Sequence, residues 1–571
     1  SDSSPEISSE YKDTTETESE PKKQGKIKKF WAKYLEKKKI TIPLTVLVVV
    51  FLLFAIPFTR YSILGLFIKK SVAVNITDSE TSRGVSEVTV TIDGKTGKTD
   101  GNGFVSIAGV RVGDRNVTVT KKYYKDLSST VLVKLRGASI VGLKIQATGR
   151  QVPVKVTNSI SKELVAGAKI KSGDSEAQTD EKGQATIVLS PNVDIAKATI
   201  TKDGYNIQDV DITITDQQTD KNTFAITPAG HVYFLSKKSG KIDVVRSNLD
   251  GSDRKTVLAG TGNEDEVATS LLASRDWKYL ALHSRRDDRA KLYLIDTSND
   301  QLSTIDEGNA EFTPVGWYDH RFMFTINRND IQNWQPKKSS LKAFNADDKQ
   351  LIVIDDSRGE GNSDIDYATE QFGQVYILEN ELSYAKTWIS DYYSGGRIVG
   401  KKNSINSVRP DDSSKRVVRD FDAKTSTYIN SKLYEPQAVY YELSDATLNV
   451  FYEYEDGQLK EDPKITQETF NKFYPTFLVS PSGTKTFWYE PRDGKNTLFI
   501  GDKNAENDKE IATLSEYQPY GWFGDEYVLV SKSGSELYVG TPGKVDSPLK
   551  ISDYHKPNNA YTGYGYGYGG L

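Results

Sequence analysis

Few residues of this chain have the types and spacing that catalysis or metal binding requires. The four histidines, His231, His283, His320 and His555, lie far apart in the sequence, and none stands in the His-Glu-x-x-His pattern that binds zinc. The chain has no cysteines, so disulfides and thiolate metal sites are excluded. We therefore predict no metal site and no cofactor.

Acidic pairs and glycine-rich turns give motifs that resemble sites only in part. Asp364 with Asp366 is a carboxylate pair of the kind that glycosidases use, but acidic surface loops are far commoner. Asp100-Gly-Asn-Gly103 begins like a calcium loop but lacks the later ligands. No Gly-x-Ser-x-Gly elbow supplies a nucleophile. We predict no catalytic residues, with a glycan-processing enzyme that assembles its site from distant segments as the alternative.

One apolar run, Ile40 to Phe58, divides the chain into two unlike parts. Roughly 20 residues at about 1.5 Å each cross a bilayer, so the run predicts a transmembrane helix. Lysines are concentrated before it, which predicts a cytoplasmic N-terminus and extracytoplasmic C-terminal domains of a cell-membrane protein. The expected anchoring residues, in contact with the lipid bilayer, are Lys37, Lys38, Lys39, Ile40, Leu44, Val50, Phe51, Phe54, Phe58 and Arg60.

The segments around this run are too polar or too repetitive to form a core. Residues 1–25 are acidic and predict a disordered cytoplasmic tail, and residues 26–39 form a basic amphipathic juxtamembrane segment. Residues 40–68 include the helix and an outer interfacial turn, and residues 555–571 alternate Gly and Tyr as a second disordered tail. The net charge of -4 is spread along the chain, so we expect no nucleic-acid partner.

Beyond residue 70 the sequence repeats with a shift of 80 residues. Thr99-Asp-Gly-Asn-Gly103 corresponds to Thr179-Asp-Glu-Lys-Gly183, and apolar residues alternate with polar ones around both turns. This pattern predicts strands with one buried face, and hence two tandem β-sandwiches over residues 71–148 and 149–217. Both resemble the carboxypeptidase regulatory-like or PEGA-type modules of bacterial surface proteins. The resemblance implies transthyretin-like or immunoglobulin-like sandwiches that act as spacers or binding accessories.

A looser repeat of about 40 residues covers residues 229–554, a length typical of propeller blades. Ser274-Arg-Asp-Trp277 and Ser480-Pro-Ser-Gly483 each precede two short strands, and Pro314-Val-Gly-Trp317 matches Pro519-Tyr-Gly-Trp522. We interpret the tryptophans as packing between blades. The units resemble the TolB-type (PD40, WD40-like) propeller repeat. Six or seven blades fit the length, and seven are favoured.

The predicted fold class is therefore mainly β: a single N-terminal transmembrane helix, two tandem β-sandwiches and a six- to seven-bladed β-propeller. The predicted function is a single-pass surface binding or scaffold protein, whose propeller head recognises an extracytoplasmic protein, peptide or glycan. A structural subunit of a cell-envelope complex and a cell-wall glycan-processing enzyme are the alternatives. The tentative partner-binding residues, three of them in the irregular segment 360–425, are Tyr392, Tyr393, Arg397 and Trp334.

Overall fold

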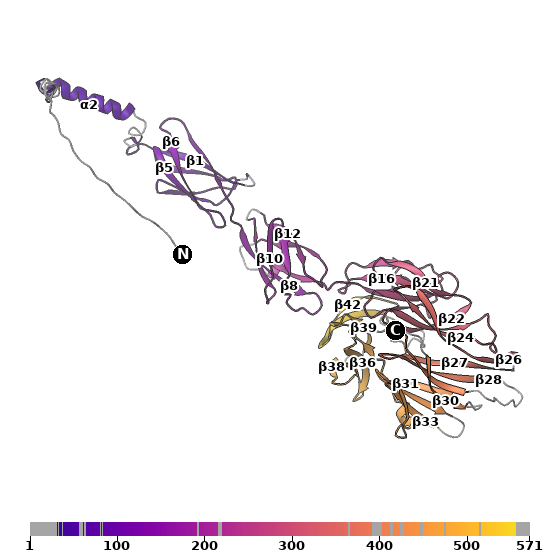
Figure 1. The fold of residues 1–571 in the computed structure, drawn as a ribbon. Coiled ribbons are helices and arrows are strands. Elements are labelled where there is room, and N and C mark those ends of the chain that lie inside the picture. Colours follow the sequence, from indigo (N-terminus) through magenta and orange to yellow (C-terminus); the bar gives the residue numbers. More distant parts are fainter. Residues whose placement is uncertain are drawn as a thin grey trace, which may run out of the picture. The chain divides into compact units, whose positions relative to one another are not determined.

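The computed structural model describes residues 31–555 except 32–33, 37, 56–60, 62–63, 80–81, 83, 191–192, 215–219, 364–365, 391–401, 411–414, 423–427, 445–448, 473–474 and 513–515. These residues are mainly in β-strands, as the sequence predicts (Figure 1). The chain divides into two compact units: residues up to 151 together with 188–194, and residues 152–187 together with 195 onward.

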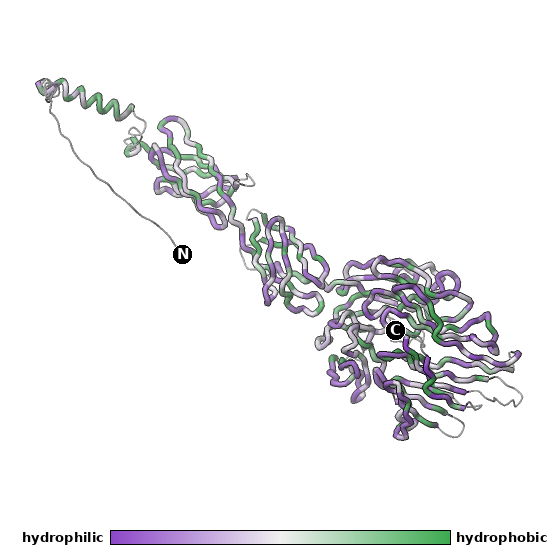
Figure 2. Tube along the Cα trace, viewed as in Figure 1, coloured by the Kyte–Doolittle hydropathy of each residue, from purple (hydrophilic) through white to green (hydrophobic). Residues whose placement is uncertain are grey.

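The transmembrane prediction is wrong, because the described residues contain no helix that is both long and apolar enough to cross a bilayer. Helix α2 (Lys38–Ala55) is hydrophobic over most of its length (Figure 2), but it has 18 residues, starts with two lysines and contains Pro43. At about 1.5 Å per residue it falls short of a hydrocarbon core of about 30 Å. The fold class loses its membrane helix, and the single-pass cell-membrane localisation is corrected with it.

Of the ten residues predicted to anchor the chain, three lie outside the described residues and seven belong to α2. Lys37, Phe58 and Arg60 lie outside the described residues, and Lys38 and Phe54 belong to α2. The remaining five are exposed on α2: Lys39, Ile40, Leu44, Val50 and Phe51.

Seven strands after α2 form two facing sheets. The strands are β1 (Lys69–Asp78), β2 (Thr89–Ile92), β3 (Lys95–Lys98), β4 (Phe104–Arg111), β5 (Gly113–Thr120), β6 (Leu127–Val133) and β7 (Ser139–Ile145). The sheet orders are β4-β1-β7 and β3-β2-β5-β6. Val72, Val74 and Ile76 alternate with polar residues along β1 and pack with Val90 and Val117 of the other sheet in one apolar cluster. The alternation therefore produces a sandwich.

The next seven strands repeat this arrangement, with a short 3-10 helix η1 (Asp220–Asn222) before the last strand. They are β8 (Arg150–Asn158), β9 (Lys169–Ser172), β10 (Ser175–Gln178), β11 (Gln184–Leu189), β12 (Ile195–Thr201), β13 (Gln208–Thr213) and β14 (Thr223–Ile226). The sheet orders, β11-β8-β14 and β10-β9-β12-β13, match those of the first sandwich strand for strand. The 80-residue sequence repeat therefore has a structural counterpart.

The Thr-Asp-x-x-Gly motif of each sandwich is a structural turn. Asp100 Oδ1 accepts hydrogen bonds from the backbone N–H groups of Asn102 and Phe104, both at 2.9 Å, and Asp180 does the same in the second sandwich. Gly103 has φ +83°, and a Cβ there would lie 2.3 Å from the Ile76 carbonyl oxygen. Because the carboxylate is committed to backbone donors, the motif is explained without a calcium ion.

Seven sheets follow, the larger of the two blade numbers predicted, and they form the propeller. Blade 1 is β15 (Val232–Ser236), β16 (Asp243–Ser247) and β17 (Lys255–Leu258); blade 2 is β18 (Ser270–Ala273), β19 (Tyr279–Ser284), β20 (Lys291–Asp296) and β21 (Gln301–Glu307); blade 3 is β22 (Ala310–Tyr318), β23 (Arg321–Arg328), β24 (Ser339–Asn345) and β25 (Gln350–Asp356); blade 4 is β26 (Gly359–Ser363), β27 (Asp366–Ile377), β28 (Leu382–Ser390), β29 (Lys402–Val408) and β30 (Lys415–Asp422).

Blades 5 to 7 have four strands each. Blade 5 is β31 (Tyr428–Glu435), β32 (Ala438–Ser444), β33 (Asn449–Glu455) and β34 (Gln458–Glu461); helix α4 (Gln467–Phe470) follows it; blade 6 is β35 (Leu478–Val479), β36 (Lys485–Arg492), β37 (Lys495–Asp502) and β38 (Lys509–Ala512); blade 7 is β39 (Tyr517–Phe523), β40 (Tyr527–Lys532), β41 (Glu536–Thr541) and β42 (Lys544–Asp553). In six of the seven blades the ladder between the last two strands contains a register shift, so the blades repeat even in their irregularities.

Tryptophans join neighbouring blades, as the sequence predicts. Trp317 is fully buried, and its indole N–H donates to the Leu272 carbonyl of the preceding blade at 3.0 Å. Trp522 makes the equivalent bond to the Leu478 carbonyl at 2.7 Å. The Pro-x-Gly-Trp motif is therefore a connection between blades, and its indoles are unavailable to a ligand.

Each blade is built from one continuous stretch of chain, including the two blades that meet at the ring closure. Blades 1 and 7 are held together instead by hydrogen bonds from Arg254 to the Ser552 hydroxyl and from the His555 backbone N–H to the Leu235 carbonyl. Within the same compact unit, the Asn158 amide of the second sandwich donates to the Tyr527 hydroxyl at 2.8 Å. Among the strands that the structure describes, none is exchanged between the first and last sheets of the ring.

Candidate functional site

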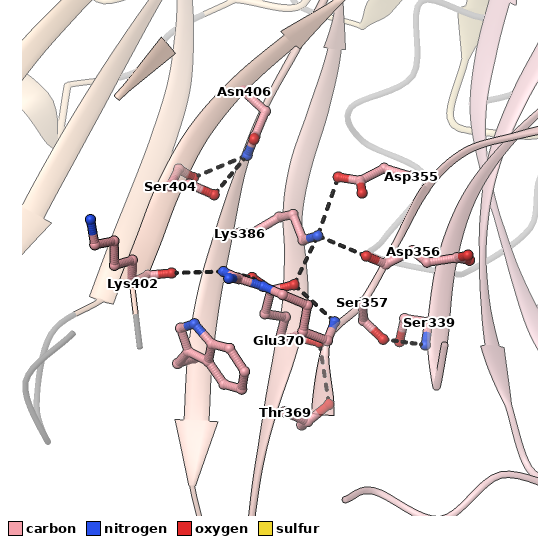
Figure 3. Close-up of polar contacts among 12 residues, drawn as sticks. Ser339, Asp355, Asp356, Ser357, Thr369, Glu370, Lys386, Lys402, Ser404 and Asn406 are labelled. Atoms are coloured by element: carbon pink, nitrogen blue, oxygen red, sulfur yellow. Dashed lines mark hydrogen bonds and ion pairs between the residues drawn. The ribbon is translucent and has the colours of Figure 1, made fainter. Parts of the chain in front are cut away.

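Charged side chains converge where blade 3 meets blade 4, at the edge where β23, β25 and β28 end and β24, β27 and β29 begin. We call this place the Arg358 edge; it comprises Asp355, Arg358, Glu370, Lys386 and Trp388. Neighbouring antiparallel strands bring their opposite ends together, so segments distant in sequence meet here. Figure 3 shows Lys386 between Asp355 on one side and Glu370 on the other.

Lys386 is the centre of this cluster, and it is only 2% exposed. Its ammonium nitrogen lies 2.8 Å from Glu370 Oε2, 3.2 Å from Asp355 Oδ2 and 2.8 Å from the Asp356 carbonyl oxygen. Lys415 approaches the same Asp355 oxygen at 2.9 Å. Removing such charges from water costs several kcal/mol each, and the cost is repaid only where every charge is paired. The cluster meets that condition.

Arg358 connects the buried charges to the surface. Its Nε and Nη2 both donate to Glu370 Oε1, and its backbone N–H donates to Glu370 Oε2 at 2.9 Å. The guanidinium also lies over the indole ring of Trp388, 5.1 Å from the ring centroid, while more than half of the Arg358 side chain stays exposed. The buried carboxylate of Glu370 therefore holds the exposed guanidinium of Arg358 in one orientation.

Strand register explains this arrangement. Glu370 pairs directly with Trp388 in the β27–β28 ladder, and Phe372 pairs with Lys386. Residues two apart on one strand share a face, so these four side chains point to the same side of blade 4. Lys386 lies 5.1 Å from the centroid of the Phe372 ring, which adds a cation–π contact to its ion pairs.

The neighbouring strand of the same sheet, β29, carries polar side chains although it is buried. Asn403 and Asn406 on β29 are both 0% exposed. The Asn403 side chain accepts a hydrogen bond from the Trp388 backbone N–H at 2.9 Å, and Asn406 donates to the Ser404 hydroxyl at 2.9 Å. Burial and then the charge of Asp355 raise the pKa of Tyr384 well above its usual value, so this phenol remains a hydrogen-bond donor to Asp355.

The structure places one of the predicted partner-binding residues at this edge. Trp334 is half-buried in the loop between β23 and β24. A Cβ on Gly359 would lie 2.8 Å from its carbonyl oxygen, so this loop packs beside Arg358. Tyr392, Tyr393 and Arg397 lie outside the described residues. Their segment is nevertheless bounded by Ser390 and Lys402, which belong to the two strands that form the edge.

Asp355, Arg358, Glu370 and Lys386 were missed from the sequence. The sequence of β28 could have indicated this site, because Tyr384, Lys386 and Trp388 occupy alternate positions and so share one face of the strand. A lysine between two aromatic residues on one face of a strand indicates a charge that the fold must compensate.

Chemically, the edge presents the guanidinium of Arg358 in a fixed orientation, and neither Asp355 nor Glu370 is left unpaired to act as a base. Both carboxylates are paired with ammonium or guanidinium groups. Among the residues that the structure describes, no three His, Cys, Asp or Glu side chains are grouped to hold a metal ion. The arrangement therefore suits recognition of a partner at a fixed guanidinium.

A second charged cluster lies on blades 2 and 3 and contains one of the four histidines. His320 Nε2 lies 3.0 Å from Asp276 Oδ2, and its Nδ1 lies 3.0 Å from both oxygens of Asp347. Burial alone would lower the pKa of His320, but the hydrogen bonds to the two aspartates outweigh it and raise the pKa. His320 of blade 3 therefore links its own blade to blade 2 through its contact with Asp276.

Comparison with known proteins identifies no family for this chain. No protein-family model matches the chain, and no curated protein matches it. Solved structures similar to it include the β-propeller domain of the Trilobed protease from Pyrococcus furiosus (13% identity, 64% of this chain and 95% of that chain, TM-score 0.32) and an oligogalacturonate lyase from Vibrio parahaemolyticus (11%, 57% and 85%, TM-score 0.31). TolB from Acinetobacter baumannii is another (10%, 53% and 74%, TM-score 0.25). These similarities assign no function to this chain.

Proposed function

We propose that this chain is a binding protein whose propeller recognises a polypeptide partner through the Arg358 edge. The observation that supports this proposal best is the fixed, exposed guanidinium of Arg358, which is held by the buried Glu370 and stacked on Trp388. Arginine and tryptophan are enriched among the residues that contribute most to protein–protein affinity. Side chains held before binding lose little entropy when the partner arrives.

A polypeptide partner fits this edge better than a glycan does. Sugar rings stack on exposed aromatic faces, but Arg358 already covers one face of Trp388. The guanidinium instead offers N–H donors to carboxylate or carbonyl oxygens, which an extended acidic segment supplies. The loop that packs beside it also carries the half-buried side chain of Trp334. We therefore favour a segment that carries Asp or Glu next to an apolar residue.

Site-specific photo-crosslinking tests this proposal. A photoreactive phenylalanine analogue replaces Asn362, which is exposed on β26, and the protein is irradiated in extracts of its own source cells. The same analogue at Gln350, exposed at the opposite end of β25, serves as the position control. We expect a discrete polypeptide adduct from position 362 alone, and its loss in Arg358→Gln but not in Arg136→Gln, which changes an exposed arginine of the first sandwich.

Two results would contradict the proposal. An adduct that survives Arg358→Gln would separate the partner from the guanidinium, and an adduct destroyed by periodate would identify a glycan instead. Circular dichroism of each variant verifies that the β-structure is retained.

A further inference from the structure

A polar pocket of about 460 Å³ lies between blades 4 and 5, away from the Arg358 edge. Its walls come from the β27–β28 turn, the β29–β30 connection and two turns of blade 5. The charged residues that line it are Glu379, Glu381, Arg409, Arg416 and Asp456. A volume of this size is within the range of small-molecule sites, which is about 300–1,000 Å³.

Arg416 is fixed in the pocket wall by one of its nitrogens. Nη2 donates to the Gly457 carbonyl at 2.9 Å and to the Ser407 hydroxyl at 3.2 Å. Every hydrogen bond that Arg416 makes to a described residue uses Nη2, which leaves Nε and Nη1 as donors for a ligand. Its position is set before any ligand binds.

Arg409 is the second cation of the pocket. It is exposed, and no residue in the described part of the chain forms a hydrogen bond or an ion pair with it. Gln437 is held by the Glu379 backbone N–H, which donates to its Oε1 at 2.6 Å, so the Gln437 amide N–H₂ is also available. The pocket therefore contains unused N–H donors on Arg409, Arg416 and Gln437.

The acidic residues of the pocket are partly compensated. Glu381 accepts a hydrogen bond from the Tyr454 hydroxyl at 2.5 Å and lies 3.9 Å from Arg416 Nη2. Glu379 lies 3.3 Å from the Lys503 ammonium nitrogen. Asp456, which precedes the Gly457 that binds Arg416, forms no hydrogen bond or ion pair with a described residue, so its carboxylate can accept from a ligand.

We infer that this pocket binds a small carboxylate that also carries hydroxyl or ammonium groups. The carboxylate pairs with the guanidinium groups of Arg409 and Arg416, whose planar geometry matches two oxygens. The hydroxyl or ammonium groups donate to Asp456. This site is independent of the Arg358 edge and does not rest on the proposed function.

Titration calorimetry of the full chain tests the inference with three probes. Tartrate supplies carboxylates and hydroxyls, threitol supplies the hydroxyls alone, and inorganic phosphate supplies an oxyanion without them. We expect saturable binding of tartrate with a Kd of about 1 mM or tighter, and no binding of threitol. Phosphate should bind at least about tenfold more weakly than tartrate, because it lacks the carbon-bound hydroxyl groups that donate to Asp456.

Arg409→Gln should weaken tartrate binding at least about tenfold, since it removes a charge-assisted pair. Folding should not change, because Arg409 has no bonding partner among the described residues. Arg289→Gln, which alters an exposed arginine of blade 2, is the control and should bind tartrate normally. Absence of saturable tartrate binding, equal binding of phosphate or threitol, or an unchanged affinity in Arg409→Gln would each overturn the inference.

Discussion

The ammonium group of Lys386 lies between two carboxylates, and both of these carboxylates are almost as buried as the lysine itself. An apolar residue would cost less to bury at this position, so the ion pairs are not there for stability alone. Their observable effect is at the surface, where Glu370 orients Arg358. We attribute the buried charges to that orienting role.

Lys386→Met should lower the free energy of unfolding of the propeller by about 3 kcal/mol, because Glu370 and Asp355 lose a buried counter-charge. Glu370→Gln in the same chain should restore part of the loss, since the two residues act as a pair. Urea unfolding followed by tryptophan fluorescence measures this, as six of the seven tryptophans lie between 277 and 522. Strictly additive losses would show that the two groups do not interact.

The His320 cluster should make stability depend on pH. Burial opposes the shift, but hydrogen bonds from His320 and the Lys278 backbone lower the pKa of Asp276 to about 2. The raised pKa of His320 gives stability that is complete below its usual value of 6.5 and lost as pH rises through the folded value. The lowered pKa of Asp276 gives stability that is complete above 3.8 and lost toward pH 2.

His320→Gln should therefore destabilise the protein by about 1 kcal/mol at about pH 5.5, after allowance for solvent screening. The loss should shrink toward about pH 8.5, as the pH rises through the raised pKa and the wild-type histidine loses its charge. Urea midpoints of both proteins at the two pH values measure this difference. A difference that does not change with pH would mean that the imidazolium charge is unimportant.

Among the secondary-structure elements, β18 and β35 each accept an indole hydrogen bond from a tryptophan of the next blade. Trp522→Phe keeps an aromatic ring but leaves the buried Leu478 carbonyl without its donor. We expect a loss of about 1–3 kcal/mol. Trp488→Phe is the matched control, because Trp488 is equally buried and makes no indole hydrogen bond to a described residue. Equal losses in thermal unfolding would assign the effect to ring volume.

The elements that the sequence predicted best are those with local signals. The turns at Asp100 and Asp180 and the alternation along β1 are visible in a few consecutive residues, so the strands could be predicted. The length of α2 could not, because the apolar run extends past Ala55, the last residue of the described helix. The Arg358 edge depends on a register shift between Phe372 and Val375 and on contact between two blades, neither of which a single sequence contains.

At the scale of the whole molecule, the ring closes where blade 1 meets blade 7, the blades at the two ends of the propeller segment. The indole of Trp277 in blade 2 donates to the Trp522 carbonyl of blade 7 at 2.8 Å. No strand of blade 7 joins the sheet of blade 1 among the described residues. Side chains and single backbone hydrogen bonds therefore hold the ring closed, and such contacts open more readily than a β-ladder.

Trp277→Phe should loosen this closure before the rest of the propeller. Hydrogen–deuterium exchange followed by mass spectrometry should show faster exchange in β15 and β42, and little change in β23 or β32. A uniform increase over all blades would show that the ring opens only when the whole propeller unfolds.

The continuity of each blade also bears on how such a chain changes over generations. Because every sheet is encoded by one uninterrupted stretch, duplication or deletion of one blade-length piece of the gene would add or remove a complete sheet and leave its neighbours whole. A ring locked by a shared strand forbids such a step, since one sheet would lose part of itself. In this propeller the first and last described sheets carry no such constraint, and a new blade would bring new loops to the faces of the ring.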